Sequence, residues 1–245
     1  MFSFLKPKPK LKDLIPSDYI DIHSHVLPGI DDGSQNIEES KFLIESMIDL
    51  GFTKVTTTPH TKSNVWDNTR VIIESKKEEI HRTLPELSQK TALNAASEYY
   101  IDEEFVKLFK SEKLLTLKDD KYVLVEMSYL NAPLQLYDFL FELQLEGYKP
   151  VLAHPERYTF YHNKPKEYEK LKKAGCLFQM NLLSSVGYYG KDVALAADQL
   201  LKKDMFDFVG SDIHNKGHIL AFENKILIKS QEQLQKAIEN NAFFG

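Results

Sequence analysis

The chain alternates between short, almost fully apolar runs and longer segments in which apolar residues recur with helical spacing. The short runs are rich in β-branched and aromatic residues and predict strands over residues 19–22, 54–58, 91–100, 122–127, 149–154, 176–181 and 206–214. The longer segments predict helices over residues 36–50, 65–87, 102–110, 134–146, 164–174, 191–203 and 230–240. Because strands that alternate with helices form parallel sheets, the pattern predicts an α/β barrel or a doubly wound sheet.

The spacing of these elements also bears on domain organisation. At 245 residues the chain is long enough for two domains, but barrels of this length often form one. No stretch rich in glycine, serine or proline separates the predicted elements, so we expect a single domain over residues 18–245. Residues 1–17 differ, because lysine and proline alternate there, and they predict a mobile basic tail. The alternative is that the four lysines and two phenylalanines of this tail contact a partner or an anionic membrane surface.

Composition narrows the class of protein. The formal net charge of −5 argues against non-specific binding to nucleic acid, which needs a basic face. The single cysteine, Cys176, excludes an internal disulfide framework and suits a reducing cytoplasm. No apolar run approaches the ~18 residues of a transmembrane helix, and the N-terminus has no long apolar segment typical of a signal peptide. We therefore expect a cytoplasmic protein without a transmembrane segment.

Candidate chemistry first appears where the first predicted strand ends. His23 and His25 lie two residues apart, and residues i and i+2 of an extended strand point to the same side. Two carboxylates, Asp31 and Asp32, follow within the next ten residues. Neutral imidazole and carboxylate are ligands of Mn, Fe or Zn. The pattern therefore suggests a metal site, although a pair of structural histidines is the alternative.

The later strands extend this pattern, because six of the seven predicted strands end in a residue type that binds metals. Besides His23 and His25, the set consists of His60, Glu98, Glu126, His154, Asp212 and His214. Taken singly, Glu98 could be a surface charge and His60 an ordinary loop histidine. Barrel enzymes, however, place their chemistry at the carboxyl ends of the strands. The whole set therefore predicts a site that holds several metal ions.

The motifs around these residues resemble those of a known superfamily. The motifs are His23-x-His25, Thr58-Pro59-His60, Ser97-Glu98-Tyr99-Tyr100, Val125-Glu126, Ala153-His154-Pro155-Glu156-Arg157-Tyr158 and Ser211-Asp212-Ile213-His214-Asn215. Together they resemble the PHP superfamily and, more narrowly, the manganese-dependent protein-tyrosine phosphatases of bacterial capsule and exopolysaccharide loci (CpsB/YwqE type). The resemblance extends from about Asp18 to near the end of the chain. It implies a distorted seven-stranded (β/α)7 TIM-like barrel, the PHP fold, with three divalent metal ions. These ions are usually Mn²⁺, with Fe or Zn as alternatives.

The resemblance also implies a ligand set for each ion. One metal would be bound by His23, His25, Glu98 and Asp212. A second would be bound by Glu98, Glu126 and His154, so that Glu98 bridges two ions. The third would be bound by His60, His214 and Asp32, with the adjacent Asp31 as the alternative carboxylate.

Other residues suit a phosphate substrate. Metal ions a few ångströms apart neutralise a phosphate dianion and lower the pKa of a bound water toward 7. Arg157 follows His154 by three residues and suits bidentate phosphate binding, the alternative being an exposed loop arginine. A general acid, where one is needed, is a metal-polarised water or a site histidine such as His60 or His214. Tyr99 either lines the pocket or packs in the core. Lys216 stands where related enzymes often carry a second arginine.

Three functions are compatible with these features. The resemblance implies a phosphatase acting on phosphotyrosine, on the tyrosine-rich tail of a bacterial tyrosine kinase that controls polysaccharide export. The protein would then be cytoplasmic or held at the inner face of the membrane by that kinase. The alternative substrate is a small phosphomonoester such as histidinol phosphate, and a nucleic-acid end is disfavoured by the acidic charge. In the third reading, the metals only stabilise the fold and the protein binds the kinase without catalysis.

Overall fold

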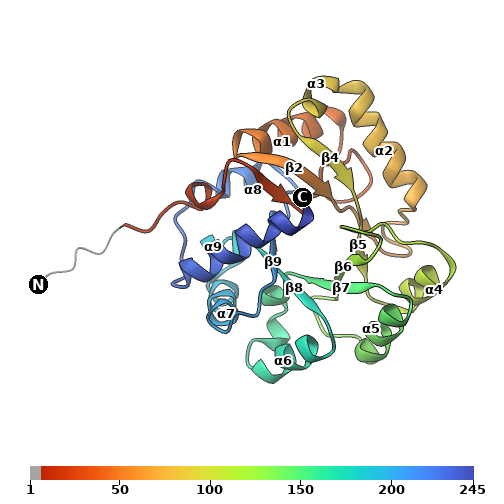
Figure 1. Cartoon of the computed structure of the whole chain (residues 1–245), viewed down its shortest axis with the longest axis vertical. Coiled ribbons are helices and arrows are strands. Elements are labelled where there is room, and N and C mark those ends of the chain that lie inside the picture. The colour runs from red at the N-terminus through yellow and green to blue at the C-terminus, as the bar shows by residue number, and fades with distance from the viewer. Residues whose placement is uncertain (1–6) are drawn as a thin grey trace, which may run out of the picture.

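The computed structural model describes residues 7–245. Its strands are β1 (Tyr19–Asp21), β2 (Phe52–Thr57), β3 (His60–Thr61), β4 (Ala92–Ala95), β5 (Glu98–Tyr100), β6 (Tyr122–Glu126), β7 (Lys149–Ala153), β8 (Leu177–Asn181) and β9 (Phe208–Gly210). Its α-helices are α1 (Ile37–Asp49), α2 (Arg70–Thr83), α3 (Pro85–Ser88), α4 (Glu103–Ser111), α5 (Leu136–Leu145), α6 (Pro165–Lys173), α7 (Lys191–Lys202), α8 (Lys216–Ala221) and α9 (Gln231–Glu239). The strands lie around the centre of the molecule and the helices surround them (Figure 1).

All the strand pairs are parallel, as the alternation of strands and helices predicts. The described residues form two sheets, with the orders β1-β2-β4 and β3-β5-β6-β7-β8-β9. This differs from the single sheet of seven strands expected for the barrel. The strand predicted over 54–58 ends at Thr57, ahead of Pro59, and His60 then begins β3, because proline has no N–H to donate to a ladder. The strand predicted over 91–100 breaks at the same level into β4 and β5.

Backbone hydrogen bonds join the segments that follow the first and last strands, β1 and β9. The N–H of Asp212 donates to the carbonyl of His23 (2.7 Å), and the N–H of His25 donates to the carbonyl of Ile213 (2.9 Å). Across the break, the N–H of Ala96 donates to the carbonyl of Thr57 (2.8 Å). These bonds gather the carboxyl ends of strands from both sheets at one place.

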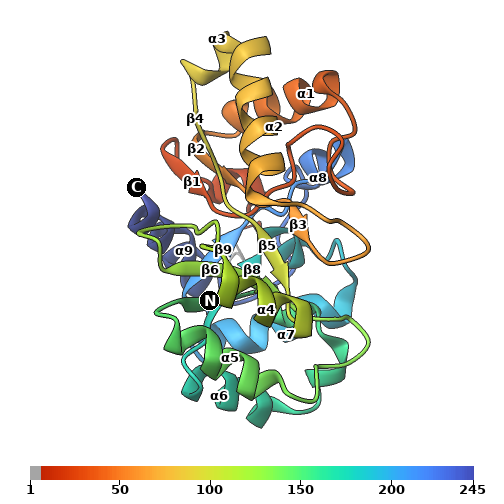
Figure 2. The ribbon, with the colours of Figure 1, turned by 90° about the vertical axis from the view of Figure 1, so that its right-hand side faces the viewer.

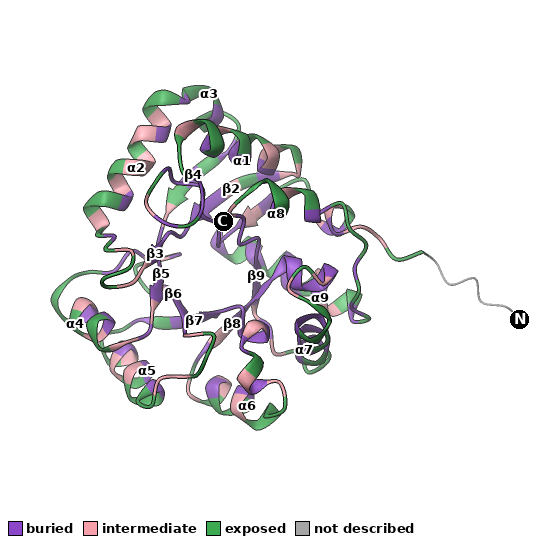
Figure 3. Cartoon of the chain, turned by 180° about the vertical axis from the view of Figure 1, so that it is seen from behind, coloured by how far each residue is buried: buried purple, intermediate pink, exposed green. Residues whose placement is uncertain are grey.

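The core explains why the strands are so apolar. Val123, Leu124 and Val125 of β6 are all fully buried, because parallel strands are covered on both faces. The helices expose their outer faces and bury the inner ones, as Figure 3 shows by its purple strands and mixed purple and green helices. In α4, for example, Phe105 and Phe109 are buried whereas Lys107 and Lys110 are exposed. No helix within residues 7–245 has the length and hydropathy to cross a membrane.

The N-terminal segment departs from the mobile tail predicted over residues 1–17. Residues 1–6 lie outside the described residues, but Leu11–Leu14 forms a 3-10 helix (η1) packed on the segment after α8. The N–H of Leu11 donates to the carbonyl of Asn224 (2.9 Å), and Lys10 and Lys12 both pair with Glu223 (2.7 and 2.6 Å). The segment is fixed to the domain by its two buried leucines, of which Leu11 is 0% exposed.

Leu11 therefore gives a test of this anchoring. We expect Leu11→Ala to lower the free energy of unfolding by about 2–5 kcal/mol, the usual effect of truncating a fully buried leucine. Urea unfolding measures the change as a lower midpoint at an unchanged slope. Leu195→Ala, at a 56% exposed position of α7, is the matched control and should change stability by less than about 0.5 kcal/mol. Equal effects of the two substitutions would mean that the N-terminal segment contributes nothing to the fold.

Candidate metal centre

The structure brings all nine predicted metal ligands together, most of them just beyond the carboxyl ends of strands. His23 and His25 follow β1, and Glu126 is the last residue of β6. His154 follows β7, whereas Asp212 and His214 follow β9. The other members are Asp32, in the loop after β1, and His60 and Glu98, which begin β3 and β5 at paired positions.

Glu98 lies at the middle of this cluster and is fully buried. Its Oε2 atom is 3.2 Å from Nε2 of His23, 3.5 Å from Nε2 of His25 and 3.1 Å from Nδ1 of His60. Its other oxygen, Oε1, lies 3.0 Å from Nε2 of His154. A single carboxylate thus faces four imidazoles, which is the geometry expected of a bridging ligand.

The four atoms that converge there point to a bound cation. Nε2 of His23, Nε2 of His25, Nδ1 of His60 and Oε2 of Glu98 are buried, and none makes a hydrogen bond within the described chain. Unpaired buried polar atoms are costly and therefore rare in folded proteins. Imidazole nitrogens and a carboxylate oxygen are suitable ligands for Mn, Fe or Zn, so these residues fit a divalent metal.

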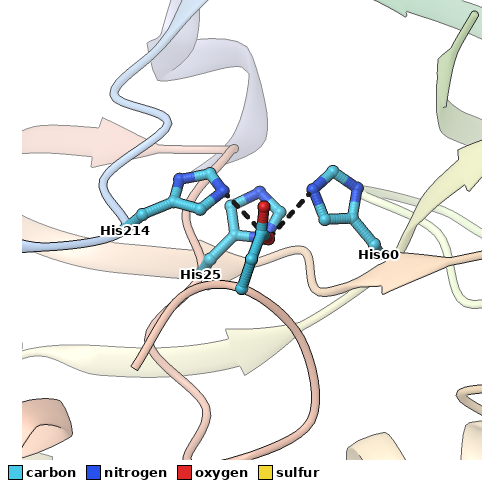
Figure 4. Close-up of side chains that lie close together, drawn as sticks. His25, His60 and His214 are labelled. Carbon is cyan, nitrogen blue, oxygen red and sulfur yellow. Dashed lines mark ion pairs between the residues drawn. The ribbon is translucent and has the colours of Figure 1, made fainter. Parts of the chain in front are cut away.

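Of the two candidate carboxylates of the third predicted ligand set, Asp32 is the one that faces the histidines. Oδ1 of Asp32 lies 3.4 Å from Nε2 of His60 and 3.4 Å from Nε2 of His214. Figure 4 shows His60 and His214 on either side of this carboxylate, with His25 behind it. Asp31 faces the other way, since its Oδ2 accepts a hydrogen bond from Nδ1 of His25 (2.7 Å). Asp32 therefore faces the cluster, and Asp31 orients His25 from behind.

The grouping of the ligand atoms differs in one respect from the sets that the resemblance implies. His60 contacts the carboxylates of Glu98 and Glu126, both at 3.1 Å from its Nδ1, as well as Asp32 through Nε2. His154 groups with His23 and Asp212. The set of His23, His25 and Glu98 is as implied, with Asp212 3.2 Å from His23. The nine residues thus form one continuous cluster.

Local backbone geometry explains how the chain presents these ligands. His154 and Asp212 have positive φ values of 37° and 51°, which are uncommon for residues with side chains and often mark functional sites. Gly33 allows the loop of Asp31 and Asp32 to fold back onto β1. A Cβ atom at Gly33 would lie 2.1 Å from the carbonyl oxygen of His25, so only glycine fits.

Some supporting residues escape sequence reasoning because they are uncharged. Oε1 of Gln179, on β8, lies 2.8 Å from Nδ1 of His23 and fixes the ring so that Nε2 faces the cluster. Nδ2 of Asn181 donates to Oδ2 of Asp212 (2.7 Å). Asn181 ends the strand predicted over residues 176–181, and Gln179 lies two residues before that end. This position is the only signal in the sequence that points to either amide.

Arg157 reaches the same cluster from the loop after β7. Its Nη1 donates to Oδ2 of Asp212 (2.8 Å), and its guanidinium lies over the rings of Tyr189 (4.0 Å) and Tyr129 (4.9 Å). A cavity of about 550 Å³ opens above the cluster, and all three residues line it. The arginine is thus held between two aromatic rings at the wall of a cavity next to the metal ligands.

Two predicted substrate contacts lie elsewhere. Tyr99 is buried against Phe105, and its hydroxyl accepts a hydrogen bond from the N–H of Leu115 (2.9 Å). Alternation along β5 explains this: Glu98 and Tyr100 face the cavity and Tyr99 faces away. Lys216 does not line the cavity, and its ammonium lies 5.8 Å over the ring of Phe42. Lys62 lines the cavity instead, and the sequence analysis does not identify this lysine as a substrate contact.

The electrostatics of the cluster predict that metal binding releases protons. Burial opposes the charged form of His23 and His60, but the carboxylates beside them, Glu98 foremost, outweigh it and raise the pKa of each to about 10. Because this pKa is above neutral pH, both imidazoles hold a proton until a cation displaces it. We therefore expect the apparent affinity for Mn²⁺ to rise at least about tenfold per pH unit between pH 6 and pH 8.

Calorimetric titration with Mn²⁺ in two buffers of different ionisation enthalpy counts the released protons. At pH 7 we expect at least one proton per cluster. A Gln231→Ala variant, at the exposed first residue of α9, controls for changes unrelated to the cluster. Identical binding heats in the two buffers would contradict the prediction.

The sequence is similar to known proteins over most of its length. The sequence profile described as "Capsular polysaccharide synthesis, CpsB/CapC" matches residues 19–238. Tyrosine-protein phosphatase YwqE of Bacillus subtilis is 29% identical over 196 residues, or 80% of this chain and 77% of the relative. Tyrosine-protein phosphatase CpsB of Streptococcus pneumoniae is 28% identical over 201 residues, or 80% of this chain and 83% of the relative.

Solved structures agree with these sequence relatives. One from a study of YwqE from Bacillus subtilis and CpsB from Streptococcus pneumoniae, described there as metal-dependent tyrosine phosphatases, superposes with a TM-score of 0.76 and 26% identity. The superposition covers 92% of this chain and 88% of that one. Histidinol phosphate phosphatase from Lactococcus lactis superposes with a TM-score of 0.55 at 14% identity, covering 90% and 94% of the two chains, which shows a shared fold.

Proposed function

This chain belongs to the CpsB/CapC family of capsular polysaccharide synthesis, and from that membership and the site we propose that it is a metal-dependent protein-tyrosine phosphatase. The observation that carries the proposal is the convergence of unpaired ligand atoms around Glu98, with Arg157 at the wall of the same cavity. The named relatives are tyrosine-protein phosphatases, and the reaction is hydrolysis of a phosphoric monoester. We propose Mn²⁺ as the metal and three ions as the full complement.

Each part of the site has a role in the proposed hydrolysis. Divalent cations held by the nine clustered residues would neutralise the phosphate and lower the pKa of water. Arg157 presents two N–H groups of a fork that matches two phosphate oxygens. Tyr129 and Tyr189 hold that guanidinium in place by stacking on it. His60 and His214 lie at the open side of the cluster, 10% and 14% exposed, and are the histidines best placed to move a proton.

The leaving group makes modest demands on these residues. A phenol has a pKa of about 10, so the departing tyrosine oxygen needs less proton donation than an alkyl alcohol would. The cavity of about 550 Å³ is wide enough for an aromatic ring, and aromatic side chains line its wall. We propose a bacterial tyrosine kinase that controls polysaccharide export as the protein substrate, and a cytoplasmic location for this protein, free or held at the inner face of the membrane by that kinase. The fold we propose for the single domain over residues 18–245 is the distorted TIM-like barrel of the PHP superfamily.

Phosphate release by chelator-stripped protein tests the function. Mn²⁺, Fe²⁺, Zn²⁺ and Mg²⁺ are added back singly, with a phosphotyrosine peptide and histidinol phosphate as parallel substrates. We expect at least about a hundredfold restoration on the peptide with Mn²⁺, and much less turnover of histidinol phosphate. Turnover of histidinol phosphate alone would replace the assignment with a small-molecule phosphatase. Metal rebinding without turnover of either substrate would favour a non-enzymatic role.

A further inference from the structure

A second cavity, of about 320 Å³, lies beside the metal centre and is lined by residues of α2, β5 and α4. These three elements lie one below another in Figure 2. Ile73 of α2, Phe105 and Leu108 of α4, and Leu114 after α4 give it an apolar wall. Nothing in the proposed chemistry uses this cavity, which we call the flanking cavity.

The flanking cavity adjoins the cavity over the metal centre. Lys62, Trp66 and Tyr100 line both. The indole of Trp66 stacks on the imidazole of His60, with ring centres 4.6 Å apart and planes inclined by 17°. Nζ of Lys62 lies 3.8 Å over the ring of Tyr100. A chain that leaves the metal centre across Tyr100 therefore enters the flanking cavity directly.

Three of the four cations that line the flanking cavity have acidic partners. The fourth, Lys62, lies at the border with the cavity over the metal centre and faces the ring of Tyr100. Among the described residues, the flanking cavity therefore offers no cluster of free cations for a second phosphate. Arg70 donates to the carbonyl oxygens of Lys113 and Leu114 (3.0 and 2.9 Å) and pairs with Glu74. Lys107 pairs with Glu104 at 2.6 Å. The ammonium of Lys113 pairs with Asp120 at 2.7 Å. The apolar wall of the flanking cavity and the pairing of these cations suit a neutral, apolar group as its ligand.

We propose that the flanking cavity binds an apolar or aromatic side chain of the substrate polypeptide, close in sequence to the phosphotyrosine. The proposal rests on the proposed phosphatase function and adds a determinant of peptide selectivity to it. An extended chain advances about 3.3 Å per residue, and one tyrosine ring separates the two cavities, so the bound residue lies roughly two to four positions from the phosphotyrosine. Trp66, Tyr100 and Leu108 are the residues that would contact it.

Two phosphotyrosine peptides that differ only at the flanking positions test the proposal. One carries phenylalanine two to four residues on each side of the phosphotyrosine, and the other carries serine there. Phenyl phosphate, which has no flanking residues, is the third substrate. For the metal-loaded protein we expect kcat/KM about tenfold higher on the phenylalanine peptide, the scale of one buried apolar contact.

A substitution in the wall of the flanking cavity should remove this preference. Leu108 is half-buried on α4, and Leu108→Glu places a charge in the wall. We expect it to equalise kcat/KM for the two peptides and to leave turnover of phenyl phosphate unchanged. Leu145→Glu, 69% exposed on α5, makes the same change of charge elsewhere and should keep the tenfold preference. Ser111→Phe, at an exposed position of the same wall, fills the cavity should Leu108→Glu fail to fold.

The outcomes separate the two proposals. Equal kcat/KM on both peptides with the unmodified protein, or a preference that survives both wall substitutions, overturns the flanking cavity as a binding site while phenyl phosphate turnover upholds the phosphatase. Absence of turnover on all three substrates overturns both. Trp66, the only tryptophan of the chain, gives a direct readout. Its fluorescence should change on titration with a phosphonate analogue of the phenylalanine peptide at about tenfold lower concentration than with the serine analogue.

Discussion

Replacing Glu98 by glutamine is expected to lower kcat on a phosphotyrosine peptide by at least about a thousandfold. Loss of a residue that merely supports a metal ligand lowers metal affinity or activity roughly 10–100-fold. We expect a larger effect for Glu98, because its carboxylate is itself a candidate bridging ligand. Its Oε2 lies within 3.5 Å of ring nitrogens of His23, His25 and His60. Glutamine keeps the shape but removes the charge, and its amide nitrogen is no metal ligand. We therefore expect the metal content to fall together with the activity.

Metal analysis of the purified protein and single-turnover kinetics measure the two effects separately. Glu146→Gln, at the exposed carboxyl end of α5, is the matched control and should retain full activity and metal content. Gln179→Ala provides an intermediate case, because it removes only the support of His23 and should cost about 10–100-fold. Full metal content and more than a tenth of the activity in Glu98→Gln would exclude Glu98 as a bridging ligand.

The ligand cluster could be expected from the sequence for a simple physical reason. Parallel strands bring their carboxyl ends to one edge, so residues far apart in sequence, such as His23 and Asp212, become neighbours. Alternation by two places His23 and His25 on one side. The same alternation excludes Tyr99 and selects Tyr100, because Glu98 already faces the cluster. Along β5, the alternation of side chains alone predicts that Tyr100, and not Tyr99, lines the cavity.

Other features depend on tertiary contacts that no local pattern encodes. The choice between Asp31 and Asp32 rests on a loop folded back over Gly33, which lies too close to the carbonyl of His25 for any side chain. Lys216 begins α8, a helix that the hydropathy pattern does not reveal, and its direction follows from that helix. The strand breaks before His60 and Glu98 occur at one level because the two residues are paired across strands.

Replacing Arg157 by lysine is expected to lower kcat/KM on the phosphotyrosine peptide by about a hundredfold. A lysine keeps the positive charge but loses the fork that matches two phosphate oxygens and the plane that stacks on Tyr189 and Tyr129. Loss of one preorganised donor to a developing charge costs about 10²–10³-fold in known enzymes. Arg82→Lys, on the exposed surface of α2, is the matched control and should behave as the unmodified protein.

Arg157 also contacts Asp212 of the candidate ligand cluster, and that contact offers a competing explanation that the experiment must separate. Its Nη1 lies 2.8 Å from Oδ2 of Asp212, so the substitution could act by displacing a metal ligand. Asn181 donates to the same oxygen at 2.7 Å, however, and holds Asp212 in the absence of the arginine. We therefore expect unchanged metal content in Arg157→Lys and at least about tenfold weaker inhibition by inorganic phosphate. Loss of metal with unchanged phosphate inhibition would instead make Arg157 a positioning residue for Asp212.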